Sequence, residues 1–224
     1  MSQSKMTPKD VLLAYWGHPA FRTSQEEIIN SLLEGKDTLA ILPTGGGKSV
    51  CFQVPALILE GCCLVISPLI ALMEDQVQRL QEMDIPAMAI MSGMGYQDTE
   101  NALDACMNDA LKFLYVSPER LETRAFRDRL LSLPITLIAV DEAHCISQWG
   151  YDFRPSYLKI AELREYFPNI NIVAVTASAT KDVVEDIQLK LNFKNAAVFR
   201  QSFERKNIRY VVQNEENKYQ RLLK

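Results

Sequence analysis

The sequence lacks the features that most often build a disulfide framework or a zinc site. It has an odd number of cysteines, five, and no two of them are separated by two residues. The N-terminal segment contains no apolar stretch typical of a secretory signal, which favours reduced thiols in a cytosolic protein. The cysteines are Cys51, Cys62, Cys63, Cys106 and Cys145.

Long apolar runs and an excess of positive charge are also missing. The most apolar stretch, residues 54–73, is interrupted by Pro55, Glu60, Gly61 and Pro68, so we predict no membrane span. The formal net charge is −4 at pH 7, so any contact with nucleic acid has to come from a local patch. What remains is a chain of 224 residues that is 48% hydrophobic, enough for one well-buried core.

Short apolar runs alternate with longer amphipathic segments along the chain. This alternation predicts an α/β fold with a mostly parallel central sheet and helices on both faces. In such folds, ligands bind beyond the carboxyl ends of the strands. We predict strands at residues 38–42, 62–67, 87–91, 111–116, 137–140 and 172–175, and helices at residues 47–59, 69–83, 97–108, 124–131, 156–166 and 181–191.

A glycine-rich loop follows the first predicted strand. Residues 42–49 read Leu-Pro-Thr-Gly-Gly-Gly-Lys-Ser, in which Thr44, Gly45, Gly46 and Gly47 would present backbone N–H groups to phosphates. Lys48 would reach the β- and γ-phosphates, and the hydroxyl of Ser49 would bind Mg²⁺. The strict pattern has glycine where this chain has Leu42, and a plain glycine-rich turn is the alternative. The strand–loop–helix context favours phosphate binding.

An acidic pair follows the fifth predicted strand. Asp141 would bind Mg²⁺ through water, and Glu142 would orient and deprotonate the attacking water. The alternative is a strand that ends in a solvated acidic turn, but the phosphate loop earlier in the chain favours a catalytic pair. His144 has no second histidine at helical spacing, so we expect a residue that couples the nucleotide to a neighbouring domain, not a zinc ligand.

Together these motifs resemble those of superfamily 2 helicases, and most closely the RecQ family. The run from Asp141 to Tyr157 resembles the second RecQ motif and its aromatic-rich loop. Residues 21–25, 67–76, 115–121 and 176–180 resemble further RecQ motifs, so the resemblance extends from about Tyr15 to Tyr210. It implies a RecA-like P-loop NTPase fold and an ATP-dependent DNA helicase that moves 3′ to 5′ and acts in DNA repair and recombination. The implied ligands are ATP, Mg²⁺, and single-stranded and forked DNA. The implied location is cytoplasmic, at the nucleoid in a bacterium or in the nucleus of a eukaryote.

The resemblance also implies an adenine site near the N-terminus. By this resemblance, Arg22 and Gln25 contact adenine and His18 stacks on it. A glutamine amide both donates and accepts hydrogen bonds, which matches the N6 and N7 edge of adenine. A second interpretation of Gln25 is a helix-surface residue, because it opens the run 25–33.

A nucleic-acid site is implied by the loop that follows the acidic pair. Trp149 and Phe153 would stack on bases and Arg154 would pair with phosphate, although aromatic residues of such loops often pack into the core. Further contacts would come from Gln148, Ser67, Ser117 and Arg120. The chain departs from the family at Tyr151, where histidine is usual, and at Ser178, where threonine is usual.

We expect residues 1–208 to form the first RecA-like domain and residues 209–224 to begin a second one. Residues 203–210 resemble the RecQ connector, although a strand and helix that complete the first domain are an equal alternative. By resemblance, the second domain supplies an arginine finger, so this chain alone should bind nucleotide, hydrolyse it slowly and unwind nothing. The competing functions are a non-catalytic nucleotide- and DNA-binding adaptor and a superfamily 2 RNA helicase. The catalytic set Lys48, Asp141 and Glu142 favours an enzyme.

Overall fold

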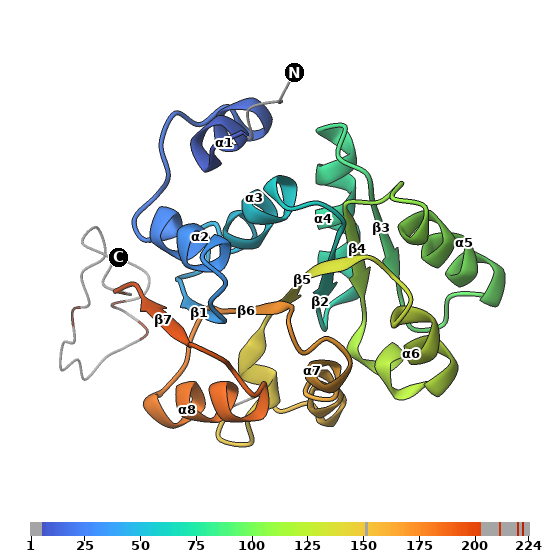
Figure 1. Cartoon of the computed structure of the whole chain (residues 1–224). Helices are drawn as coiled ribbons and strands as arrows, with labels where there is room; N and C mark the ends of the chain where they lie inside the picture. Colours follow the sequence, from blue (N-terminus) through green and yellow to red (C-terminus); the bar gives the residue numbers. More distant parts are fainter. Residues whose placement is uncertain (1–5, 151, 203–210, 212–218, 220, 222–224) are drawn as a thin grey trace.

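The computed structural model describes residues 6–150, 152–202, 211, 219 and 221 (Figure 1). The structural statements below concern these residues. Tyr151, the predicted connector at 203–210 and most of the predicted second-domain segment lie outside them.

A parallel sheet forms the centre of the described chain, with the strand order β3-β4-β2-β5-β6-β1-β7. The prediction of an α/β fold with a parallel sheet is confirmed. Because every strand points the same way, all carboxyl ends lie along one edge, which we call the carboxyl edge. The strands are β1 (Thr38–Ile41), β2 (Cys62–Ile66), β3 (Ala87–Ile90), β4 (Phe113–Val116), β5 (Ile135–Val140), β6 (Asn171–Thr176) and β7 (Ala197–Arg200).

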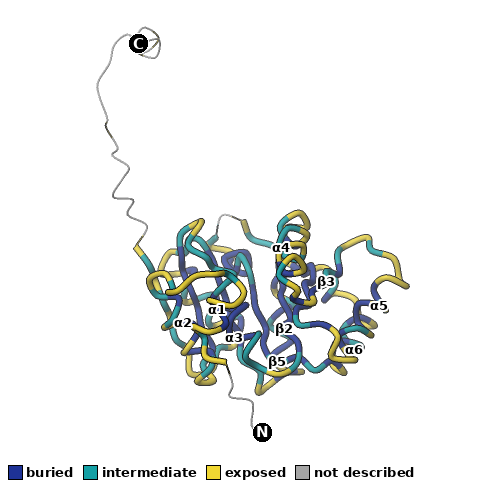
Figure 2. Tube along the Cα trace, turned by 90° about the horizontal axis from the view of Figure 1, so that it is seen from above, coloured by how far each residue is buried: buried dark blue, intermediate teal, exposed yellow. Residues whose placement is uncertain are grey.

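Helices cover both faces of this sheet, which explains why the central strands are apolar at consecutive positions. In β2, Leu64 packs into the core on one face, and its neighbour Val65 packs into the core on the other. The first core is covered by α5 (Tyr96–Met107), α6 (Arg124–Leu130), α7 (Leu163–Tyr166) and α8 (Lys181–Lys190). The second is covered by α2 (Gln25–Leu33), α3 (Val50–Ile58) and α4 (Ile70–Glu82). Figure 2 shows the buried strands β2 and β5 in the interior, and exposed residues on outer helices such as α4 and α5.

Two elements at the ends of the described chain were not predicted. Helix α1 (Pro8–Trp16) packs on α2 and α3, where Val11 contacts Ile29 and Val54. Strand β7 pairs with β1 at the edge of the sheet and alternates between half-buried and exposed residues. None of the described helices is long and apolar enough to cross a membrane.

The predicted helix at residues 156–166 is wrong in its form. The segment is a 3₁₀ helix, η3 (Pro155–Ile160), followed by the single turn of α7. Tertiary contacts hold η3 against the sheet, because the Tyr157 hydroxyl donates to the carbonyl of Asp141 at 2.8 Å and Ser156 Oγ lies 3.3 Å from Glu119 Oε1. Two further short 3₁₀ helices, η1 (Pro118–Glu122) and η2 (Ala143–Ile146), follow β4 and β5 at the carboxyl edge.

Candidate functional site

The glycine-rich loop connects β1 to α3 at the carboxyl edge. Gly45 and Gly47 adopt the left-handed conformation, with φ of +78° and +74°, which a residue with a Cβ rarely adopts. Thr44 and Gly45 are exposed, and Lys48 and Ser49 are half-buried. The loop therefore presents its main chain at the edge of the sheet where ligands bind in this class of fold.

Gln25 and Arg22 hold this loop from the side. Gln25 is only 3% exposed, so it is not a solvated helix residue. Its Nε2 donates to the carbonyls of Gly46 and Gly47 at 3.3 and 3.1 Å, and its Oε1 accepts from the Arg22 N–H at 2.9 Å. The Arg22 guanidinium donates to the carbonyl of Gly45. Two of the residues predicted to contact adenine, Arg22 and Gln25, thus bond directly to the predicted phosphate loop.

A cavity of about 600 Å³ lies beside these residues. Its volume is in the range of small-molecule sites. The predicted residues His18, Arg22, Gln25, Gly47 and Ser49 line it. So do residues that sequence reasoning missed, namely Trp16 at the end of α1, Gln76 and Arg79 of α4, and Met83 just after α4. No sequence signal marked the α4 residues, because a helix face beside a cavity has the same pattern as a solvated face.

The acidic pair directly follows β5. The Asp141 N–H donates to the carbonyl of Ile66 in the neighbouring strand β2 at 2.9 Å, which fixes the pair at the carboxyl edge. Burial and the charge of Glu142 raise the pKa of Asp141 to about 6. A hydrogen bond from His144 lowers the pKa of Glu142, and the nearby Lys48 charge adds to this effect. The pKa values of the two carboxyls therefore shift in opposite directions, and Glu142 ionises more readily than Asp141.

His144 links the acidic pair to the end of β6. Its Nδ1 lies 3.3 Å from Glu142 Oε2 and 2.9 Å from Thr176 Oγ1, and the ring is 6% exposed. Thr176 opens the segment 176–180 that resembles the third helicase motif, and its hydroxyl also donates to the carbonyl of Ser178. A change at Glu142 therefore has a direct route to this segment through two side chains.

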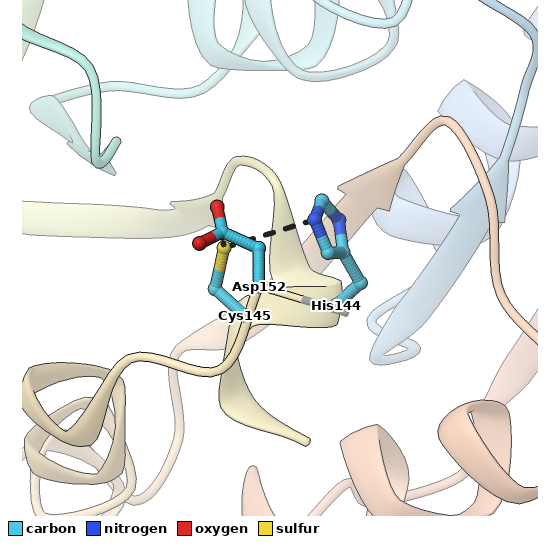
Figure 3. A group of neighbouring side chains, drawn as sticks. All are labelled: His144, Cys145 and Asp152. Atoms are coloured by element: carbon cyan, nitrogen blue, oxygen red, sulfur yellow. Dashed lines mark hydrogen bonds between the residues drawn. The ribbon is translucent and has the colours of Figure 1, made fainter. Parts of the chain in front are cut away.

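His144, Cys145 and Asp152 form a second group around the same histidine (Figure 3). Cys145 Sγ lies 3.8 Å from His144 Nε2 and 3.7 Å from Asp152 Oδ2. Burial raises the pKa of Cys145 to about 12, so without a bound metal ion the thiol stays protonated near neutral pH. The group joins His144 to the loop that follows it.

Two of the predicted nucleic-acid residues are buried serines. Ser67 and Ser117 are 1% and 2% exposed. Ser67 Oγ donates to Asp141 Oδ2 at 3.4 Å, so this hydroxyl faces the acidic pair. The side chains of Ser67 and Ser117 are therefore closed to a ligand outside the protein.

The two arginines predicted to contact nucleic acid have partners inside the protein. Arg120 donates to the carbonyls of Met91 and Met94 at 2.8 and 2.7 Å. Arg154 donates to the carbonyl of Pro68 at 3.1 Å and pairs with Asp152 at 3.3 Å. Both side chains thus tie together loops of the carboxyl edge.

The remaining predicted nucleic-acid residues differ in exposure. Trp149 is 76% exposed and Gln148 is also exposed. Phe153 is half-buried, with the Lys190 ammonium 5.9 Å from its ring centre. Trp149 also lines a cavity of about 670 Å³ together with His144 and Ser178. The indole is thus open to a ligand, next to the residue that contacts Glu142.

Comparison with known sequences finds one matching family and several close relatives. The family described as DEAD/DEAH box helicase matches residues 22–187. ATP-dependent DNA helicase RecQ of Pasteurella multocida is 45% identical over 208 residues, which are 93% of this chain and 33% of that protein. RecQ of Bacillus subtilis is 43% identical over 94% of this chain and 36% of its own length. ATP-dependent DNA helicase Q1 of Rattus norvegicus is 41% identical over 91% of this chain and 34% of its own length. The chain spans about a third of the length of these relatives.

Solved structures share the fold at lower identity. The helicase domain of Pyrococcus furiosus Hef has a TM-score of 0.61 and 22% identity, covering 80% of this chain and 37% of that one. The DUF1998 helicase MrfA bound to DNA has a TM-score of 0.70 and 18% identity, covering 90% and 28%. At such identity the likeness concerns the fold alone, a RecA-like domain of helicases.

Proposed function

The chain belongs to the DEAD/DEAH box helicase family, and from this premise we propose that it is the nucleotide-binding motor domain of an ATP-dependent DNA helicase of the RecQ type. One observation carries the proposal: the phosphate loop, the acidic pair and the predicted adenine residues meet at one edge of the sheet. Gln25 contacts Gly47, and the charge of Lys48 acts on both Asp141 and Glu142. The identity to relatives named RecQ DNA helicases supports DNA as the nucleic acid.

In this proposal the chain's own groups divide the work of ATP hydrolysis. The main chain of the loop and Lys48 hold the phosphates, and Arg22, Gln25 and His18 hold the adenine. Glu142, kept ionised by its hydrogen bond from His144, orients the attacking water and accepts its proton. The hydrogen bond between His144 and Thr176 couples ATP binding and hydrolysis to the position of the segment 176–180.

The donor set beside the loop fits a magnesium ion. The half-buried carboxyl of Asp141, with a pKa raised by burial, and the hydroxyl of Ser49 are the hard oxygen donors that Mg²⁺ prefers. These two residues would hold the ion. When bound, it would neutralise charge on the phosphates.

The finer activity forms part of the same proposal. We propose 3′-to-5′ movement along single-stranded DNA, unwinding of forked DNA, and a role in repair and recombination. We further propose that rapid hydrolysis needs a second RecA-like domain that brings an arginine finger, worth roughly 10³–10⁵ in rate. Without it, the chain should bind nucleotide and hydrolyse it slowly, and unwinding of DNA by this chain alone would contradict that part.

A titration with fluorescent ATP and Mg²⁺ tests the nucleotide site. Unlabelled ATP and GTP serve as competitors, and Lys48→Ala and Lys181→Ala serve as matched lysine variants. We expect binding that Lys48→Ala abolishes and Lys181→Ala leaves unchanged, because Lys181 lies exposed on α8. ATP should displace the probe better than GTP. If both variants bind the probe equally well, the proposed role of Lys48 and its loop in binding phosphates is wrong.

A further inference from the structure

The exposed apolar side chains of the carboxyl edge form a row that extends beyond the predicted nucleic-acid residues. Trp149, after β5, is 76% exposed; Leu69 and Ile70, after β2, are 47% and 42% exposed; and Tyr96, after β3, is 79% exposed. In the sheet these strands stand in the order β3-β4-β2-β5, so Tyr96 and Trp149 lie at the two ends of the row.

The loop before Tyr96 is held against the segment 117–120, which contains the predicted nucleic-acid residues Ser117 and Arg120. Arg120, in η1, bonds through its guanidinium to the carbonyls of Met91 and Met94, which belong to the loop between β3 and α5. The main-chain N–H of Ser117 donates to the carbonyl of Ile90 at the end of β3. Tyr96 is the first residue of α5 after this loop. The position of Tyr96 is therefore set by the segment 117–120, which was predicted to contact single-stranded DNA.

The charges at this edge favour contact with bases over contact with phosphates. The guanidinium groups of Arg120 and Arg154 are occupied by carbonyls and by Asp152. The first turn of α5 carries Asp98, whose charge opposes a phosphate near that helix end. An aromatic ring, by contrast, stacks on any base without a cation.

We propose that Tyr96 is a base-stacking residue that extends the single-strand site from the loop after β5 to the outer strand β3. The proposal rests on the proposed function, because the ligand is the same single-stranded DNA. It adds a contact at the far end of the row, about three strand spacings, or roughly 15 Å, from the end of β5.

The test is the affinity of the 224-residue chain for fluorescent oligothymidine, measured by anisotropy. We expect Tyr96→Ala to weaken binding by about fivefold or more, as loss of one stacked base implies, and Tyr96→Phe to keep it. The matched control is Tyr166→Ala, since Tyr166 is also an exposed tyrosine. It is the last residue of α7 and precedes the start of β6, so it lies at the edge of the sheet opposite the carboxyl edge. Because stacking is little screened, the loss should keep its size between about 50 and 200 mM salt.

The outcomes distinguish failure of the stacking role of Tyr96 from failure of the proposed helicase function. If the unaltered chain binds DNA and Tyr96→Ala binds as well as Tyr166→Ala does, the stacking role of Tyr96 is wrong and the helicase proposal stands. A loss that vanishes at the higher salt also overturns it, because the contact would then be electrostatic. If the unaltered chain binds no oligothymidine, its proposed DNA binding fails together with the role of Tyr96. Thermal melting and ATP binding of Tyr96→Ala should match those of the unaltered chain.

Discussion

The side-chain amide of Gln25 donates a hydrogen bond to the main-chain carbonyl of Gly47 across 3.1 Å. The contact is so close that a Cβ added at Gly47 would lie 2.4 Å from Gln25 Nε2. Gln25 therefore helps to shape the phosphate loop. On the proposed function, we expect Gln25 to affect the binding of every nucleotide, and that of adenine nucleotides most if it also contacts the base.

We expect Gln25→Ala to weaken binding of both ATP and GTP and to narrow the preference for ATP. The loss of hydrogen bonds at a half-enclosed site is on the order of 1–2 kcal/mol, or roughly tenfold in affinity. Competition of ATP and GTP against a fluorescent nucleotide measures both effects. Gln78→Ala is the control, because Gln78 is exposed and bonds to Glu82 on the outer face of α4. A selective loss for ATP, with GTP unchanged, would mean that Gln25 reads the base without shaping the loop.

Glu142→Gln should separate binding from hydrolysis. The substitution keeps the size of the side chain but removes the group that accepts the proton of water, so hydrolysis should fall by about 10²–10⁴-fold. Nucleotide affinity should change little. The measurement compares phosphate release with the fluorescent ATP titration, and Glu165→Gln, an exposed residue of α7, serves as control. Unchanged phosphate release would assign the role of base to another group.

Local patterns were sufficient to predict most of the fold. The strands β2 and β5 are apolar at consecutive positions because both of their faces are covered, and this is visible in the sequence. Helix α1 was missed although its start carries a capping box of Thr7 and Asp10 around Pro8. Strand β7, whose residues alternate between half-buried and exposed at the edge of the sheet, was also missed.

The candidate site was predictable where it depends on neighbours in sequence. Lys48 and Asp141 follow strands, and parallel strands bring their ends to one edge. The partners of the arginines were not predictable, because Arg120 bonds to Met91, 29 residues away, and Arg154 to Pro68, 86 residues away. An arginine beside an aromatic residue has the same sequence pattern whether it faces a phosphate or a carbonyl of its own chain.

Asp141→Asn should stabilise the nucleotide-free protein above neutral pH. The ordinary pKa of the carboxyl is 3.8, and burial with the charge of Glu142 raises it to about 6. The folded state thus holds the proton more tightly than the unfolded state, so ionised Asp141 costs stability above about pH 6 and the cost disappears below about pH 4. The rise in the pKa of Asp141 from 3.8 to about 6 corresponds to an upper limit of ~3 kcal/mol of lost folding stability.

Thermal melting in EDTA from pH 8 down to pH 4 measures this effect. The melting temperature of Asp141→Asn should exceed that of the unaltered chain at pH 8, by several degrees at most, and the difference should shrink as the pH falls. Glu142→Gln gives the contrast. The pKa of Glu142 is lowered by its bond from His144, so loss of that charge should not stabilise at pH 8. Equal melting of Asp141→Asn and the unaltered chain at pH 8 would show that the Asp141 carboxylate is well solvated.

Arg164→Met should destabilise the fold without touching the nucleotide site. Arg164 pairs with Asp37 at 2.6 Å, and the two side chains are 5% and 1% exposed. Asp37 also accepts the N–H groups of Ile172 and Lys194, so it joins the starts of β1 and β6 at the edge opposite the site. Removal of one partner leaves a buried charge, which costs about 3–5 kcal/mol.

At this chain length, that loss corresponds to a fall in melting temperature of roughly 6–20 °C. Lys181→Ala is the control, because the pair Lys181–Glu185 spans 3.9 Å with side chains 89% and 66% exposed, and such pairs contribute little. Below the melting transition, Arg164→Met should bind ATP as the unaltered chain does, because the sheet separates the two edges. A melting temperature close to that of Lys181→Ala would mean that water reaches Asp37 once its partner is gone.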